Sequence, residues 1–285
     1  MNQGAPGQVD ETDVSLARKD QALGDILTRL GSVIVAFSGG SDSAYLACAA
    51  TRALGGQALC VTAESASYPR HHRAAALRLV AARGLRHEFI TTLEMDRPEY
   101  RANPANRCYY CKQELYGQLT RIARERGIAA IVDGNNADDR GDYRPGRDAA
   151  REAGVRSPLD EAGLTKAEIR ELSRRAGLPT WNEPASACLS SRIPYNVEVT
   201  EEKLRAIEQA EALLRDLGFR LCRVRHHGDT ARLEIDAADM PRAIDPATRT
   251  AIVSGLRALG FRYVALDLQG YRTGSLNEGL TLRPV

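Results

Sequence analysis

Short apolar runs alternate with helical patterns between residues 33 and 133 of this 285-residue chain. The spacing predicts strands over 33–37, 58–62, 87–91 and 129–133, with helices over 42–54, 69–83 and 109–126 between them. Strands joined through helices pair in parallel, with right-handed crossovers. We therefore expect an α/β fold, a doubly wound, mostly parallel sheet that binds ligands at the carboxyl ends of its strands.

The flanking segments indicate how the chain divides. Residues 1–14, rich in Gly and Pro and then acidic, are expected to form a disordered leader before a helix over 15–30. The main domain is predicted to span 15–194. Residues 195–285 are predicted to form a smaller α+β domain that binds substrate or supports assembly, with elements at 200–217, 220–225, 230–236, 238–259 and 262–267.

The first strand leads into the segment Ser38, Gly39, Gly40, Ser41, Asp42 and Ser43. The glycines allow close approach of the backbone, the serines offer hydroxyl donors, and the first amides of the following helix point at the same place. The segment lacks the Lys of the Walker loop and lacks Gly-x-Gly-x-x-Gly. It predicts a phosphate or pyrophosphate site, and the alternative is a tight turn without a ligand.

Two other segments should face the same crevice, because they also follow predicted strands. One contains Ala63, and the other contains Gly134 in a Gly/Asn/Asp turn that an Asx-turn explains nearly as well. Asp42 could orient Mg²⁺ on the pyrophosphate, with Asp138 or Asp139 completing the ligand set, because Mg²⁺ prefers carboxylates beside phosphate oxygens.

Three of the six cysteines point to sulfur or metal chemistry. Cys108 and Cys111 lie three apart at a predicted helix start, where Arg107 and Lys112 are expected to favour thiolate. Cys188 lies in a loop of small residues. Three cysteines on an iron–sulfur cluster would leave one iron open for exogenous sulfide. A zinc site normally needs four ligands, and the thiols could also be incidental; Cys48, Cys60 and Cys222 are expected in the core.

A cationic pair is predicted in the second half of the chain. Arg223 and Arg225 alternate along a strand, so both guanidinium groups reach one face and could clamp a phosphate or carboxylate. An ordinary exposed strand face explains the pattern equally well.

The motifs also carry a family resemblance. The segment 38–43 resembles the Ser-Gly-Gly-x-Asp-Ser signature of PP-loop ATP pyrophosphatases. Together with Gly134–Asp139, Ser157–Leu159 followed by Lys166, and Pro184–Arg192, it makes about residues 20–275 similar to the LarE family of ATP-dependent sulfur transferases.

The resemblance implies an activity. LarE enzymes use ATP and Mg²⁺ to adenylylate pyridinium-3,5-dicarboxylate mononucleotide, release pyrophosphate and AMP, and form thiocarboxylates for the nickel-pincer nucleotide. It implies ATP binding by residues 38–43, Ala63 and Gly134, a catalytic Asp42, and substrate binding by Arg192, Arg223 and Arg225.

The resemblance leaves two sulfur routes open. In some members a cysteine matching Cys188 gives up its own sulfur. Others carry three cysteines, and Cys108, Cys111 and Cys188 make this chain similar to the type with a [4Fe-4S] cluster fed by sulfide or another donor, in a homo-oligomer.

Composition narrows the remaining classes. A net charge of +2 gives no general case for nucleic acid, which disfavours a PP-loop tRNA thiolase. An ammonia-using PP-loop enzyme and a nucleotide-binding regulator with a zinc knuckle also stay open as alternative functions.

No apolar run approaches membrane-span length, and the first residues lack signal-peptide features. We expect a cytoplasmic protein with reduced cysteines.

Overall fold

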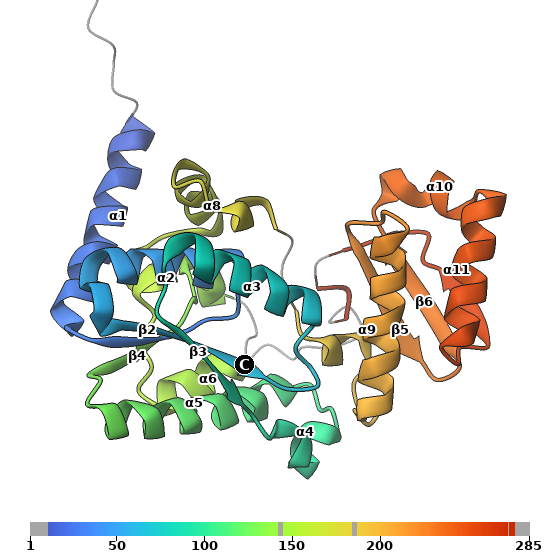
Figure 1. Ribbon diagram of the computed structural model, residues 1–285, viewed down its shortest axis with the longest axis horizontal. Coiled ribbons are helices and arrows are strands. Elements are labelled where there is room, and N and C mark those ends of the chain that lie inside the picture. The colour runs from blue at the N-terminus through green and yellow to red at the C-terminus, as the bar shows by residue number, and fades with distance from the viewer. Residues whose placement is uncertain (1–10, 142–144, 184–186, 273, 277–285) are drawn as a thin grey trace, which may run out of the picture.

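The computed structural model describes residues 11–141, 145–183, 187–272 and 274–276. A larger unit with a four-stranded sheet lies beside a smaller unit with a three-stranded sheet (Figure 1). The larger sheet has the order β3-β2-β1-β4. Its strands are β1 (Val33–Ala36), β2 (Ala58–Glu64), β3 (His87–Thr91) and β4 (Ala130–Val132).

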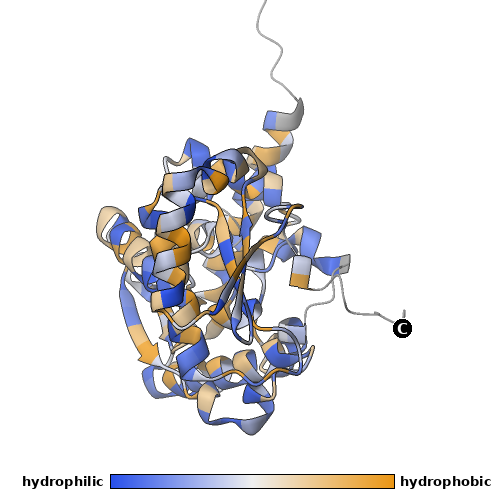
Figure 2. Cartoon of the chain, turned by 90° about the vertical axis from the view of Figure 1, so that its right-hand side faces the viewer, coloured by the Kyte–Doolittle hydropathy of each residue, from blue (hydrophilic) through white to orange (hydrophobic). Residues whose placement is uncertain are grey.

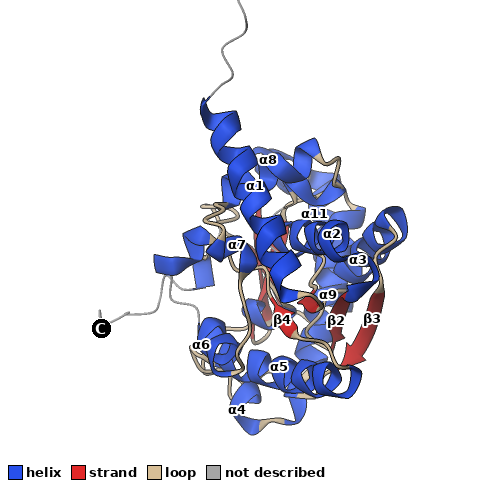
Figure 3. Cartoon of the chain, turned by 90° about the vertical axis from the view of Figure 1, so that its left-hand side faces the viewer, coloured by secondary structure: helices blue, strands red, loops and turns tan. Residues whose placement is uncertain are grey.

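All pairings in the larger sheet are parallel, and β1 lies in the middle, with Val35 opposite both Cys60 and Val132. Helices cover both faces, with the sheet between them (Figure 3). On one face lie α1 (Glu11–Leu30), α2 (Ser41–Leu54), α3 (Arg70–Arg83) and α8 (Lys166–Arg175); on the other lie α5 (Arg107–Arg126) and α6 (Pro145–Glu152). The predicted doubly wound α/β fold is confirmed.

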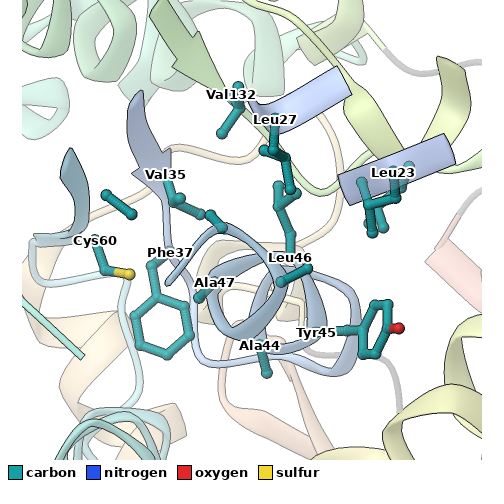
Figure 4. Packing of buried hydrophobic residues seen from close by; sticks show 14 of the residues in the cluster. Leu23, Leu27, Val35, Phe37, Ala44, Tyr45, Leu46, Ala47, Cys60 and Val132 are labelled. Carbon is teal, nitrogen blue, oxygen red and sulfur yellow. The ribbon is translucent and has the colours of Figure 1, made fainter. Parts of the chain in front are cut away.

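Side chains of the central strands alternate between two apolar cores. Val33 and Val35 belong to the first core, which also contains Leu27 of α1 and Leu46 of α2 (Figure 4). Ile34 faces the second core, together with Leu59, Val61, Leu115 and Leu119. Burying one such aliphatic side chain contributes about 1.5–3 kcal/mol to the free energy of folding. The two cores therefore hold the sheet in place, and with it the edge whose loops form the candidate site.

Helix α1 begins at Glu11, four residues before the predicted start, so residues 11–14 of the expected leader are helical. The ion pair between Asp13 and Arg175 of α8, with N···O 2.5 Å, lies in this added turn. Residues 1–10 lie outside the described part of the chain.

The smaller sheet has the order β5-β6-β7, with β5 (Cys222–His227) antiparallel to β6 (Thr230–Ile235) and β7 (Tyr263–Leu266) parallel to β6. Helices α9 (Glu201–Asp216), α10 (Met240–Ile244) and α11 (Pro246–Ala258) complete this unit. The single helix predicted over 238–259 is wrong. The Asp245 carboxylate accepts hydrogen bonds from the amides of Ala247 and Thr248, and Pro246 starts a new helix there.

A third apolar cluster joins the two units. It contains Tyr100 from α4 (Pro98–Arg101), Leu189 and Ile193, and Leu204 and Ile207 from α9. The short helix α7 (Pro158–Glu161) belongs to the larger unit. The division at residue 194 stays a prediction.

The helices show polar and apolar residues side by side along their length (Figure 2). Among the described residues, no helix is both long and apolar enough to cross a membrane.

Candidate active site

The loop between β1 and α2 has the shape of an anion cradle. Gly39 has a φ of 77°, and a Cβ there would lie 3.1 Å from the Cβ of Ala76 in α3. Position 39 therefore requires glycine for its backbone conformation and for its contact with α3. Gly40 has an ordinary extended φ of −77° and precedes the first turn of α2, so the two glycines differ in what they require.

Hydroxyl groups within the loop hold its conformation. The Ser38 amide donates to Ser43 Oγ at 3.2 Å, and Ser43 Oγ donates to the Gly40 carbonyl at 3.1 Å. The Tyr68 hydroxyl donates to the Ser38 carbonyl at 3.1 Å. Ser38 and Ser43, predicted as phosphate donors, thus have partners inside the loop.

Two buried polar atoms at the start of α2 lack such partners. Ser41 Oγ and Asp42 Oδ1 make no hydrogen bond within the described part of the chain. Buried polar atoms are almost always paired, and here a donor and a carboxylate oxygen stand unpaired where the helix N-terminus favours negative charge. This combination suits a phosphate with its cation.

The other oxygen of Asp42 brings two distant segments to the cradle. Asp42 Oδ2 lies 2.5 Å from Lys166 Nζ and accepts a hydrogen bond of 3.3 Å from Asn136 Nδ2. The Lys166 amide donates to Asp138 Oδ2 at 2.8 Å. Three motifs far apart in the sequence therefore meet at one ion pair: the loop before α2 and the turn after β4, which the strand order predicts at one crevice, and Lys166, which it does not.

Gly134 approaches α2 closely. A Cβ on Gly134 would lie 3.0 Å from the Ser43 amide nitrogen. The Asn135 amide donates to Asp133 Oδ1 at 3.2 Å, as in an Asx-turn. The sequence predicts that Gly134 approaches a nucleotide closely. In the structure, Gly134 approaches the first turn of α2.

The remaining predicted cradle residues lie around this turn. Asp139 is buried and accepts a hydrogen bond from the Asn136 amide at 3.0 Å. Ala63 lies near the end of β2, opposite Ile90 of β3. Asp138 and Asp139 therefore help to hold the turn, and their predicted contact with Mg²⁺ stays a prediction.

Cys188 and Cys108 lie near the buried cation Arg107, and Cys111 interacts electrostatically with both cysteines. Helix α5 begins at Arg107, so Cys108 and Cys111 fall in its first turn as predicted. Arg107 Nη2 lies 4.0 Å from Cys188 Sγ. Burial lowers the pKa of Arg107, but the negative charges of Cys188 and Cys108 outweigh that effect and raise it. Arg107 therefore favours negative charge at Cys188 and Cys108.

The predicted preference for thiolate at Cys111 stays a prediction, because the surroundings of this side chain favour the neutral thiol. Burial raises the pKa of this thiol, and the charge of Glu94 raises it further. Glu94 is 1% exposed; its Oε1 accepts a hydrogen bond of 3.2 Å from Ser67 Oγ, while its Oε2 has no partner among the described residues. Sequence reasoning missed Glu94, because no motif spacing links it to the cysteines.

Within the described ranges, no three His, Cys, Asp or Glu side chains stand close enough together to hold a metal ion. The chemistry of the donor set nevertheless fits a cluster, since thiolate is the ligand that iron–sulfur clusters use. Cys48, Cys60 and Cys222 pack in or against the cores, as predicted. Residues 184–186 of the predicted Cys188 motif lie outside the described part.

Three arginines hold the turn that carries Cys188. Arg107 donates to the Ser190 carbonyl at 2.9 Å, and Arg225 donates to the Ser191 carbonyl at 2.6 Å. Arg192 donates to the carbonyls of Ala187 and Cys188, both at 2.8 Å. The main chain around Cys188 is thus fixed from both units.

Two of these arginines already form ion pairs with buried carboxylates. Arg192 pairs with Glu211 at 2.8 Å with both side chains fully buried, and Arg225 pairs with Glu234 at 2.6 Å. Arg192 and Arg225 thus position the Cys188 turn, and their predicted contact with substrate stays a prediction.

Arg223 does share the β5 face with Arg225, as predicted, but it is buried, and its guanidinium lies 5.2 Å from the centre of the Tyr271 ring. Its predicted contact with substrate stays a prediction.

We expect Arg225→Ala to lower the free energy of unfolding by about 3–5 kcal/mol, because it leaves the fully buried Glu234 carboxylate without its main partner. Urea denaturation followed by circular dichroism measures this. The double change Arg225→Met with Glu234→Leu should cost less than Arg225→Ala alone, since it removes both charges.

The exposed pair Arg126–Glu88, with N···O 2.7 Å, provides the control for this prediction. Glu88→Ala should change the free energy of unfolding by about 1 kcal/mol or less. An Arg225→Ala protein as stable as the Glu88→Ala protein would contradict the positioning role.

Two known proteins are similar to this chain over nearly their whole length. The chain matches no model of a known protein family. It is 41% identical over 266 residues to an uncharacterized protein of Synechocystis sp., covering 93% of this chain and 99% of that one. It is 37% identical over 268 residues to a protein of Lactiplantibacillus plantarum named pyridinium-3,5-bisthiocarboxylic acid mononucleotide synthase, covering 94% and 96%.

A more distant match is an uncharacterized protein of Methanocaldococcus jannaschii, 30% identical over 171 residues, which covers 60% of this chain and 66% of that protein.

Proposed function

The chain belongs to the family of the pyridinium-3,5-bisthiocarboxylic acid mononucleotide synthase, the LarE family, and we propose that it uses ATP to convert the two carboxylates of pyridinium-3,5-dicarboxylate mononucleotide to thiocarboxylates. The product serves the biosynthesis of the nickel-pincer nucleotide.

The observation that carries this proposal is the unpaired pair Ser41 Oγ and Asp42 Oδ1 in the first turn of α2. A pyrophosphate group would accept from the hydroxyl and from the helix amides. Mg²⁺ would take Asp42 as its carboxylate ligand and would neutralise charge on the phosphates. Lys166, 2.5 Å from Asp42, supplies a further positive charge at the same place.

In the first step, a carboxylate oxygen of the substrate attacks the α-phosphorus of ATP. The new bond joins that oxygen to phosphorus, and the bond from phosphorus to pyrophosphate breaks. The loop amides, the Ser41 hydroxyl and Lys166 stabilise the charge that develops on the departing pyrophosphate. The product is an acyl-adenylate.

In the second step, a sulfur nucleophile attacks the activated carbonyl carbon. A carbon–sulfur bond forms, and the bond to AMP breaks, so that AMP leaves with both electrons of that bond. Arg107, 4.0 Å from Cys188 Sγ, stabilises negative charge on sulfur. Two carboxylates require two such cycles.

Two routes supply the sulfur in this proposal, and the three cysteines bear on both. In one, the Cys188 thiolate displaces AMP and forms a thioester with the substrate; loss of the Cα proton of Cys188 and cleavage of its Cβ–Sγ bond then release the thiocarboxylate and leave dehydroalanine at position 188. In the other, Cys108, Cys111 and Cys188 hold a [4Fe-4S] cluster, which when bound supplies an iron without a protein ligand, where sulfide binds. We favour the cluster because the chain has all three cysteines: Cys111 interacts electrostatically with Cys108 and Cys188, and Arg107 lies beside Cys188. The family resemblance also supports action as a homo-oligomer in the cytoplasm.

The test is to incubate the protein under anaerobic conditions with ATP, Mg²⁺, the dicarboxylate mononucleotide and sulfide. Pyrophosphate, AMP and a product in which sulfur replaces carboxylate oxygen are expected together, by enzymatic assay and mass spectrometry. In one parallel reaction, unmodified tRNA replaces the mononucleotide. In another, ammonium replaces sulfide. Thiolated tRNA or an amidated product, without thiocarboxylate, would contradict the proposal.

A further inference from the structure

Arg107 is a buried cation without a carboxylate partner in the described part of the chain. It is 3% exposed, and the groups with the strongest electrostatic effect on it are the thiols of Cys188 and Cys108. Arg192 and Arg225, which hold the Cys188 turn together with it, each pair with a buried glutamate. Buried charges are usually paired. The charge of Arg107 is therefore available to an anion at the sulfur position.

Neutral oxygen atoms accept the hydrogen bonds of this guanidinium. Arg107 Nη1 donates to Asn103 Oδ1 at 2.5 Å and to the Ser190 carbonyl at 2.9 Å. Arg107 Nη2 lies 4.0 Å from Cys188 Sγ. A carboxylate in place of either acceptor would cancel the positive charge, whereas an amide oxygen and a main-chain carbonyl orient the guanidinium and leave it charged. The contacts of Nη1 thus direct Nη2 toward the sulfur without neutralising the group.

Asn103 is itself held by the segment that follows the Cys188 turn. It is fully buried and has a φ of 54°, a left-handed conformation that Asn and Asp adopt more readily than most side chains. Its Nδ2 donates to three main-chain carbonyls of that segment, those of Pro194 at 2.7 Å, Val197 at 3.1 Å and Ile193 at 3.3 Å. Because the amide nitrogen faces these acceptors, the amide oxygen faces Arg107.

We propose that Asn103 is a positioning residue for sulfur transfer, whose neutral amide holds Arg107 beside Cys188 and leaves the guanidinium charge to stabilise the attacking sulfur; the inference rests on the proposed function. Negative charge lies on that sulfur in the second step, so a neutralised Arg107 would stabilise it less. Asp has nearly the same shape as Asn and tolerates the same backbone conformation, but its carboxylate would pair with Arg107. The first step takes place at the start of α2 in the proposed mechanism and does not use this contact.

The first test measures the charge at Cys188 without turnover. The full chain, reduced and freed of iron, is alkylated with neutral iodoacetamide or with iodoacetate, an anion of similar size, and peptide mass spectrometry gives both rates at Cys188. The ratio of the iodoacetate rate to the iodoacetamide rate does not depend on the amount of thiolate, since both reagents react with the same thiolate. Asn103→Asp should lower this ratio by about 5-fold, as expected when one charge about 4 Å away in water is neutralised.

Two further variants separate the added charge from the lost contacts. Asn103→Gly removes the same hydrogen bonds without adding a carboxylate, and glycine adopts the left-handed conformation freely. It should lower the ratio less than Asn103→Asp does. Arg101→Ala is the matched control, because Arg101 of α4 forms an exposed ion pair with Glu198, N···O 3.1 Å, that links α4 to the same segment. It should leave the ratio unchanged.

The second test measures turnover. Asn103→Asp should lower thiocarboxylate formation by about 10-fold or more, while pyrophosphate release stays at the wild-type rate; a general loss of structure would lower both. Asn103→Gly should also lose thiocarboxylate formation relative to pyrophosphate release, and it decides the matter if Asn103→Asp protein does not fold.

The two tests fail in different ways. An unchanged alkylation ratio in folded Asn103→Asp protein, an equal fall of the ratio in Asn103→Gly protein, or wild-type sulfur transfer in Asn103→Gly protein would overturn the role of Asn103 and leave the proposed function in place. A wild-type protein that forms no thiocarboxylate would overturn the proposed function and the role of Asn103 in transfer, whereas the alkylation ratio would still measure the charge beside Cys188.

Discussion

Asp42→Asn is expected to lower substrate-dependent pyrophosphate release by about 100-fold, because it removes the negative charge at the centre of the proposed nucleotide site. Asparagine keeps the size of the side chain and can still accept hydrogen bonds from Lys166 and Asn136. The fold should therefore survive. Pyrophosphate is measured with ATP and the mononucleotide both saturating.

The exposed Asp25 of α1, which accepts a hydrogen bond of 2.9 Å from Gln21, gives the control. Asp25→Asn should release pyrophosphate at the wild-type rate, and thermal melts should show that both variants are folded. If folded Asp42→Asn protein also released pyrophosphate at the wild-type rate, the 38–43 loop would not be the nucleotide site.

Cys188→Ala is expected to abolish transfer of sulfur while the protein still releases pyrophosphate. In the proposed mechanism, activation takes place at the start of α2, whereas Cys188 lies on the turn held by Arg107, Arg192 and Arg225. Loss of the thiol removes the second step alone. Product mass spectrometry and the pyrophosphate assay, run on the same reaction, measure the two steps separately.

The same experiment on the other two cysteines distinguishes the sulfur routes. If the three thiolates hold a cluster, Cys108→Ala and Cys111→Ala should each lose iron and sulfur transfer, as Cys188→Ala does. If Cys188 is consumed, only its substitution should stop transfer, and wild-type protein should become lighter by about one H₂S after turnover. Iron analysis after anaerobic purification and intact-mass measurement decide between them.

Cys48→Ala is the matched control, since Cys48 lies on α2 and packs against the core away from Cys188. It should keep wild-type iron content and activity. A mass loss confined to Cys188, with fully active Cys108→Ala and Cys111→Ala proteins, would contradict the hypothesis that sulfur comes from a cluster.

The fold of this chain is largely readable from local patterns. Strands β1, β2 and β4 are short, largely apolar runs, and β1 lies within one residue of its predicted bounds. The break between α10 and α11 is not predicted, because the apolar pattern continues through Pro246 and only the capping contacts of Asp245 mark the new start. Capping depends on side-chain geometry, which periodicity does not carry.

The site is only partly predictable. The glycine-rich loop and the turn that carries Asn136 meet as the strand order predicts, whereas the position of Lys166 at Asp42 is not predicted from that order. The roles of Arg192 and Arg225 are not predictable, because their partners Glu211 and Glu234 become neighbours only through tertiary packing. An alternating pair of arginines indicates that both face one side of a strand, but it does not indicate whether that side is open or covered.

The turn at Cys188 has a consequence for how such proteins diversify. The arginines that hold it donate to main-chain carbonyls, and the thiol itself makes only the long contact with Arg107 among the described residues. The path of the backbone therefore does not depend on which atom the side chain carries at position 188. Lineages can exchange one reactive group for another at this position and inherit the same architecture around it.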